Sequence, residues 1–116
     1  MKIYKGNREV TANASFCSGF NSFLGLRFRK QLEKDEALVI EVDKESRLDA
    51  AIDMLFVFYP IDVIWLDRNK KVVDKRNVKP FSLLSIPRKP AKYVIEVMQG
   101  VGSKFNLNDK VKFKNK

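Results

Sequence analysis

The chain has 116 residues with no histidine and a single cysteine, and this composition excludes several common kinds of site. Without histidine there is no Ser-His-Asp triad, no Cys-His pair and no usual zinc-enzyme centre, and one cysteine builds neither an internal disulfide nor a Cys-rich metal site. A hydrophobic share of 45% is enough for one core. We therefore expect one domain over residues 1–116, loose only in its last few residues.

The net charge of +9 is placed unevenly along the chain. Residues 1–67 carry a net charge of −2, residues 68–92 carry +8, and residues 93–116 carry +3. A positive field of this kind attracts anions and speeds their association. The alternative is a solvated lysine-rich surface, as in proteins from hot environments, but those are enriched in Glu as well as Lys, and Glu is not abundant here.

The N-terminal residues predict two short strands followed by a helix. Strands at 2–4 and 8–12 flank a Gly-Asn pair that suits a tight hairpin turn. Apolar residues at helical spacing then predict a short helix over about residues 18–24, and Gly25 follows where the helix would end.

The middle of the chain contains the two most apolar segments. A strand is expected at residues 38–42, and Ser46 with Asp49 three residues later resembles the cap of a helical turn. Residues 54–58 and 62–66 are apolar runs, the second with Asp62 at its start, as expected for strands whose two faces are both covered.

The C-terminal half continues with short strands. Turn-forming residues at 67–70 predict a strand over 71–76 that returns antiparallel to 62–66. Three prolines exclude residues 80–92 from a central strand, because proline has no N–H for the ladder. The remaining expected elements are strands at 93–98 and 110–113 and a helical turn at 103–107.

Only the turns and the short helix interrupt this series of strands. The pattern predicts a mainly-β fold, a compact six- to seven-stranded antiparallel barrel or sandwich with one or two short helices.

Two arginines and a group of later basic residues are the candidate anion-binding groups. Arg27 and Arg29 alternate around Phe28, so in an extended strand both guanidinium groups lie on one face. They form an anion site, or a structural ion pair if Asp62 lies nearby. The diffuse basic surface is expected to comprise Lys70, Lys71, Lys75, Arg76, Arg88, Lys89 and Lys92.

Aromatic residues are interleaved with the C-terminal lysines. Phe81, Tyr93, Phe105 and Phe113 lie among them, a mixture that a single-stranded nucleic-acid surface would use for backbone attraction and base stacking. The alternative is that these aromatics belong to the core of the fold.

The remaining chemistry for catalysis is a carboxylate pair, such as Asp62 with Asp53 or Glu41. A carboxylate in an apolar strand can have a raised pKa and serve as a general acid. The alternative is that Asp62 accepts hydrogen bonds from an arginine or from backbone N–H groups just after Pro60. No glycine pattern matches a phosphate-binding loop, and no metal site or cofactor is expected.

The single thiol, Cys17, is typical of a reducing compartment, so a cytoplasmic protein is expected. Because Cys17 follows Phe16, we interpret it as a small buried apolar residue rather than a reactive thiol. The N-terminal residues are polar and give no signal-peptide pattern, and no membrane segment or membrane partner is expected.

Several blocks of the sequence resemble one family in order and spacing. The blocks are Gly-Leu-Arg-Phe-Arg at 25–29, Met-Leu-Phe-Val-Phe at 54–58, Pro-Ile-Asp-Val-Ile-Trp-Leu-Asp at 60–67, Val-Val at 72–73, Ala-Lys-Tyr-Val-Ile-Glu-Val-Met-Gln-Gly at 91–100 and Asn-Asp-Lys-Val at 108–111. They are similar to the patterns of domain-of-unknown-function family 192, small bacterial and archaeal proteins. The resemblance covers residues 10–113 and implies a mainly-β fold. It does not assign any activity to the chain.

The positions that match the family pattern are Gly25, Arg29, Asp62 and Asp67. The chain departs from it in two places, since the family's Trp-Met-Lys-Asn-Thr stretch is missing before Pro60, and Arg27 replaces the usual Met. We expect a non-catalytic binding or accessory module whose basic face meets an anionic ligand or a nucleic acid. The alternative is a small enzyme that uses carboxylates around Asp62.

Overall fold

The computed structural model describes residues 1–18, 31–54 and 57–115 of the chain. Strands dominate, which confirms the mainly-β prediction. The elements are β1 (Lys2–Lys5), β2 (Arg8–Thr11), β3 (Asn13–Ser18), β4 (Glu36–Ser46), β5 (Ile61–Leu66), β6 (Val72–Val78), β7 (Ala91–Met98), the 3-10 turn η2 (Val101–Lys104) and β8 (Val111–Lys114). Within the described residues, no helix is long and apolar enough to cross a membrane.

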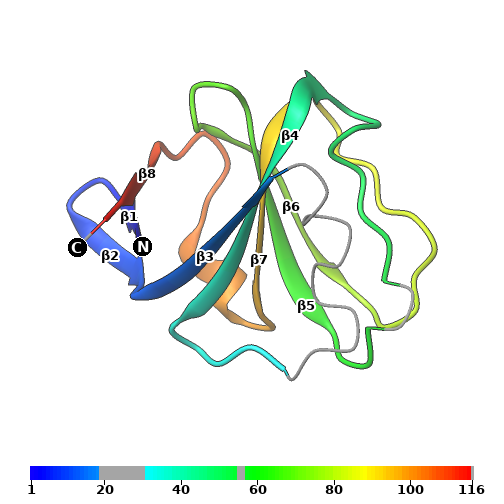
Figure 1. The fold of residues 1–116 in the computed structure, drawn as a ribbon, viewed down its shortest axis with the longest axis horizontal. Coiled ribbons are helices and arrows are strands. Elements are labelled where there is room, and N and C mark those ends of the chain that lie inside the picture. Colours follow the sequence, from blue (N-terminus) through cyan, green and yellow to red (C-terminus); the bar gives the residue numbers. More distant parts are fainter. Residues whose placement is uncertain (19–30, 55–56, 116) are drawn as a thin grey trace.

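The strands form two open sheets rather than a closed barrel (Figure 1). One sheet has the order β2-β1-β8 and the other has the order β3-β4-β7-β5-β6. The sandwich prediction is therefore confirmed, with two corrections. The described residues contain eight strands rather than six or seven, and β3 pairs with β4 in parallel, whereas every other pair is antiparallel.

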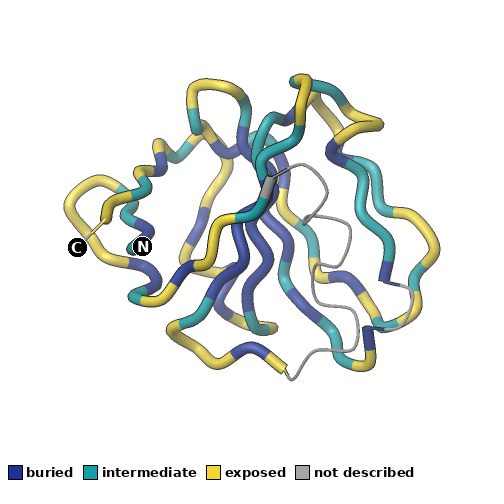
Figure 2. The backbone as a smooth tube through the Cα atoms, viewed as in Figure 1, coloured by how far each residue is buried: buried dark blue, intermediate teal, exposed yellow. Residues whose placement is uncertain are grey.

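The five-stranded sheet is apolar on both faces. Successive side chains of a strand point to opposite faces, so β5 contributes to two separate clusters. Ile64 and Leu66 lie in the cluster under the three-stranded sheet, while Val63 and Trp65 lie in the cluster on the other face. Figure 2 shows the resulting concentration of buried residues along the central strands. Both faces must therefore be covered by other parts of the chain.

The three-stranded sheet and η2 cover the first face. Ile3, Val10 and Val111 come from its three strands and share the cluster with Phe105, which is fully buried. An antiparallel bridge between Lys71 and Lys110 joins the start of β6 to the residue before β8. This bridge places β8 beside the turn that connects β5 and β6.

Two irregular segments, residues 47–54 and 79–90, cover the second face. They pair with each other through Ile52 and Ser85, and Figure 1 shows them on the side of the sheet away from the three-stranded sheet. The indole N–H of Trp65 donates to the carbonyl of Ala50 at 2.8 Å, which attaches the first segment to β5.

The expected strand at 54–58 is wrong for its described residues. Met54 donates its N–H to the carbonyl of Ser82, and its own carbonyl accepts the N–H groups of Val57 and Phe81. Met54 and Val57 are buried, so these two residues belong to the core without being part of a strand ladder, whereas Phe58 is exposed.

The other expected elements have mixed outcomes. The N-terminal hairpin and the return of β6 along β5 are confirmed. Of the segment 80–92, expected to lie outside a central strand, residues 80–90 are irregular as predicted, but Ala91 and Lys92 begin β7, the middle strand of the five-stranded sheet. Ser46 accepts the N–H groups of Leu48 and Asp49, but in a turn without a helix. The helical turn expected at 103–107 lies earlier, at η2. The helix expected at 18–24 lies outside the described residues apart from Ser18, which ends β3.

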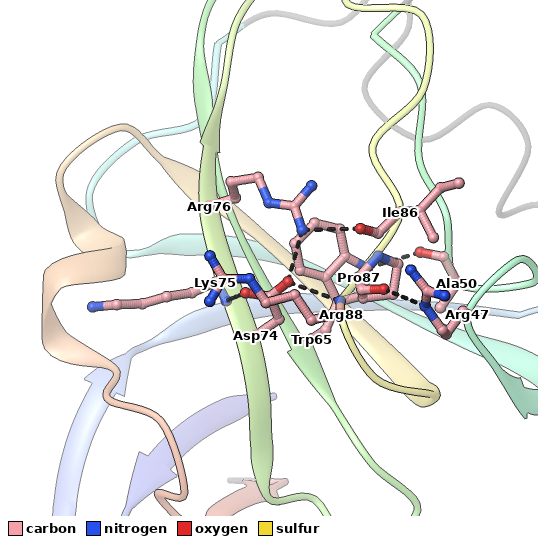
Figure 3. Close-up of polar contacts among 9 residues, drawn as sticks. All are labelled: Arg47, Ala50, Trp65, Asp74, Lys75, Arg76, Ile86, Pro87 and Arg88. Atoms are coloured by element: carbon pink, nitrogen blue, oxygen red, sulfur yellow. Dashed lines mark hydrogen bonds and ion pairs between the residues drawn. The ribbon is translucent and has the colours of Figure 1, made fainter.

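A buried carboxylate holds the second irregular segment against the sheet (Figure 3). Asp74 in β6 is only 3% exposed and accepts the Arg76 guanidinium at 2.7 Å and the backbone N–H of Arg88 at 3.0 Å. Its other oxygen accepts the N–H of Lys75. The Arg76 guanidinium also donates to the carbonyl of Ile86 and lies 5.1 Å from the ring centre of Trp65.

We predict that Asp74→Ala lowers the free energy of unfolding by about 3 kcal/mol, because it leaves the Arg76 guanidinium and the Arg88 N–H without their acceptor. This loss is at the low end of the cost of breaking a buried ion pair, because the Arg76 side chain is partly exposed. The matched control is Glu45→Ala, since Glu45 also accepts an arginine side chain and a backbone N–H, both from Arg68. The Arg68 side chain is 71% exposed and that of Glu45 is partly exposed, so the control should cost less than about 1 kcal/mol. Equal losses in urea unfolding would contradict the prediction.

Candidate anion-binding site

The first predicted site residues cannot be placed. Gly25, Arg27 and Arg29 lie outside the described residues, so an anion site at the two arginines stays a prediction.

Asp62 is held by backbone N–H groups, but not by those expected after Pro60. One carboxylate oxygen accepts the N–H groups of Gly100 and Gly102 at 2.8 and 2.9 Å, and the other accepts the Asn77 amide at 2.9 Å. A Cβ on Gly102 would lie 2.7 Å from the Asp62 carboxylate, so glycine permits this close approach. Asp62 therefore fastens η2 to β5 and β6.

The enzyme alternative required at least two carboxylates in one cleft. The pocket at Asp62 has a volume of about 210 Å³ and is lined by Asp62, Lys75, Arg76, Asn77, Gly102 and Ser103. Asp62 is the one acid of that set, and neither Asp53 nor Glu41 belongs to it. No group of three or more His, Cys, Asp or Glu side chains suited to a metal ion occurs in the described part of the chain.

Three of the predicted basic residues use their charged groups inside the fold. Arg76 lies against Asp74 and Trp65, as described above. The Lys75 ammonium donates to the carbonyl of Phe105 at 2.7 Å and fastens the segment after η2 to β6. The Lys92 ammonium donates to the carbonyls of Val42 and Asp43 and lies near Glu41.

The other predicted basic residues lie at the surface on separate segments. Arg88 and Lys89 are exposed in the irregular segment after Pro87, and Lys71 is exposed at the start of β6. Lys70 lies in the turn between β5 and β6, where its ammonium lies near the rings of Tyr93 and Phe113.

One pocket brings together four lysines, three of which the sequence reasoning did not single out. Lys110, Lys112 and Lys114 join Lys70 around a pocket of about 320 Å³ that is also lined by Asn69, Val111 and Phe113. We call this the lysine pocket. Its lining contains no carboxylate. The alternation Lys-Val-Lys-Phe-Lys is the sequence signal, because in a strand it places all three lysines on one face.

Asp67 shapes the turn that positions Lys70. Its side chain accepts the N–H groups of Asn69 and Lys71, and its carbonyl accepts the N–H of Lys70. Lys70 has a φ of 62° in this turn, a left-handed conformation that is uncommon for residues other than glycine. The family-matching position Asp67 is thus a turn former next to the lysine pocket.

Aromatic rings support two of the pocket lysines. The Lys70 ammonium lies 5.5 Å from the ring centre of Tyr93 and 5.7 Å from that of Phe113, and the two rings meet edge to face. The Lys114 ammonium lies 4.8 Å from the ring centre of Tyr4. A ring face stabilises an ammonium without neutralising it, so both lysines keep their charge for a ligand.

The aromatics expected among the lysines are mostly core residues. Phe105 is fully buried, and Tyr93 and Phe113 are partly buried against the first core cluster. Phe81 is exposed, but it contacts Phe58 in the irregular layer. Base stacking on these four rings is therefore not the main feature of the surface.

The comparisons with known proteins agree with the resemblance of the sequence blocks. The model of the DUF192 family, described as "Uncharacterized ACR", matches residues 7–113. The chain belongs to this family. A UPF0127 protein of Pyrococcus furiosus is 36% identical over 102 residues, which cover 87% of this chain and 84% of the relative. One of Pyrococcus horikoshii is 39% identical over 92 residues, covering 78% and 76%.

A longer relative, a UPF0127 protein of Thermococcus sibiricus, is 39% identical over 82 residues, and the match spans 51% of its length. Among solved structures, a Novosphingobium aromaticivorans protein of unknown function has a TM-score of 0.83 at 18% identity, covering 97% of this chain and 82% of that one. A candidate transcription regulator of Sinorhizobium meliloti has a TM-score of 0.82 at 16% identity, covering 96% and 89%. These two likenesses show the fold alone.

We predict that Tyr93, whose ring lies beneath the Lys70 ammonium, titrates with a raised pKa. Burial, and then the charge of Glu41, raise the pKa of the Tyr93 hydroxyl above 10.0. The unfolded chain loses this proton at an ordinary tyrosine pKa of about 10, so the free energy of unfolding should fall as pH rises from there through the folded pKa.

The measurement is the tyrosinate absorbance of the wild type and of Tyr93→Phe during alkaline titration. The substitution should remove a component that titrates above the ordinary tyrosine pKa, because the pKa of Tyr93 is raised. Persistence of that component in the variant would contradict the assignment.

Proposed function

We propose that this DUF192 protein is a non-catalytic binding module that holds an anionic partner at the lysine pocket. The observation that carries the proposal is the set of four lysines around one concave surface whose lining contains no acid. An anion placed there meets several cations at once, whereas the pocket at Asp62 offers one carboxylate that is already hydrogen-bonded.

Other acids near the lysine pocket are used locally. Asp67 accepts N–H groups of its own turn, and Asp109 accepts the N–H of Asn106 and lies 3.3 Å from the Lys5 ammonium. The ammonium groups of Lys110 and Lys112 have no ion pair within residues 1–18, 31–54 and 57–115. Like charges that lie close together repel, so a bound anion would relieve this repulsion.

The charge of the rest of the chain supports the same role without forming part of the pocket. The overall charge of +9 steers anions toward the protein, and Lys71, Arg88 and Lys89 add exposed positive charge on other segments. A nucleic acid belongs to the class of partners that this field attracts. A chain with one cysteine is suited to a reducing compartment, so we propose a cytoplasmic location.

The test is charge reversal at the pocket, with inorganic polyphosphate as the probe in calorimetric titrations. Lys110→Glu combined with Lys112→Glu should weaken binding at least about tenfold, because two attractive contacts become repulsive. The matched control is Lys34→Glu combined with Lys44→Glu, which changes the net charge equally at exposed positions outside the pocket. The control should change affinity less than about threefold.

Wild-type binding should also weaken steeply between low and moderate salt. Equal losses in the two double variants would show attraction by net charge only, and no binding at low salt would remove the proposal.

A further inference from the structure

The outer edge of β8 presents a backbone N–H to the lysine pocket. On one side β8 pairs with β1, and on the other the N–H of Val111 donates to the carbonyl of Lys70 at 2.9 Å. Peptide N–H groups alternate in direction along a strand. The N–H of Phe113 therefore points the same way as that of Val111, away from β1.

The Lys70 turn covers this edge at Val111 but not two residues further along. The pocket lies there, lined by Asn69 and Lys70 on one side and by Phe113 and Lys114 on the other. The backbone N–H of Phe113, a neutral donor held in place by the strand, therefore lies among the ammonium groups of the pocket lysines. Backbone N–H groups and lysines together are the usual means by which proteins hold oxyanions.

The donor set favours a compact group with several oxygens and more than one negative charge. A phosphate monoester carries about −1.5 to −2 charges at neutral pH and three acceptor oxygens, more than a carboxylate offers. The pocket, at about 320 Å³, has the size of a small-molecule site rather than that of a surface for a duplex.

We infer that the lysine pocket binds the phosphate of a small phosphate monoester, with the N–H of Phe113 as its fixed donor and the four lysines as its counter-ions. This inference rests on the proposed function and narrows it to a ligand class. The Phe113 ring stays beneath Lys70 and takes no direct part.

The experiment compares two substitutions at Phe113, with AMP as the probe at low salt. Phe113→Ala removes the ring and keeps the N–H, whereas Phe113→Pro removes both. Proline is tolerated at an edge position whose N–H is not used in the ladder. Calorimetric titration should show affinity for AMP about tenfold weaker for the proline variant than for the alanine variant.

A measurement on the unaltered protein keeps the test decisive if the proline variant fails to fold. In nitrogen–proton correlation spectra, AMP should shift the amide signal of Phe113 more than that of Lys112, whose N–H points toward β1. Equal affinities of the two variants, or an unmoved Phe113 amide, would overturn the inference.

A third set of titrations separates this inference from the proposed function. Polyphosphate binding that depends on Lys110 and Lys112, without AMP binding, would sink the monoester assignment and leave the anionic module standing. If a single-stranded oligonucleotide binds and AMP does not, the monoester assignment also fails, and the ligand of the anionic module is a nucleic acid. If none of the three probes binds, both proposals fail.

Discussion

The carboxylate of Asp74 is the buried charge on which the irregular layer of this protein depends. A five-stranded sheet with two apolar faces must be covered twice, and in the part of the chain that the structure describes a second sheet covers one of these faces. The other cover consists of irregular segments with few ladder hydrogen bonds of their own. Asp74 attaches the segment 79–90 to the sheet, because its carboxylate accepts hydrogen bonds from the Arg76 guanidinium and from the backbone N–H of Arg88. The Trp65 indole, bonded to Ala50, attaches the other segment.

This arrangement divides the basic residues into two groups. Arg76, Lys75 and Lys92 donate to buried or partly buried acceptors, so their charges serve the fold. Among the described residues, Lys112 and Lys114 of β8 have no such acceptors, because β8 is an outer strand whose polar face turns to solvent. A positive net charge alone therefore says little about where a partner binds. Other exposed cations such as Arg88 and Lys89 lie on a separate segment, whereas the β5–β6 turn brings Lys70 to the lysines of β8 at the lysine pocket.

The sequence predicted features that depend on neighbours in the chain. The β5–β6 hairpin followed from its turn residues, and the burial of β5 on both faces followed from its continuous apolar run. The apolar run at 54–58 misled, because burial does not say whether a backbone pairs in a ladder. No residue pattern within β3 or β4 indicates that these two strands pair in parallel. At the site, the alternating lysines after residue 109 could have been noticed, but their meeting with Lys70 depends on a bridge between residues 71 and 110.

The division of the lysines can be measured directly by their rates of reaction with an amine-selective ester, followed residue by residue by mass spectrometry. Lys110 and Lys112 should react quickly, whereas Lys75 should react slowly because its ammonium donates to the carbonyl of Phe105. Added polyphosphate should slow the reaction of Lys110 and Lys112 and leave that of Lys75 unchanged. Equal rates for all three lysines, or protection that is uniform over the surface, would contradict the account.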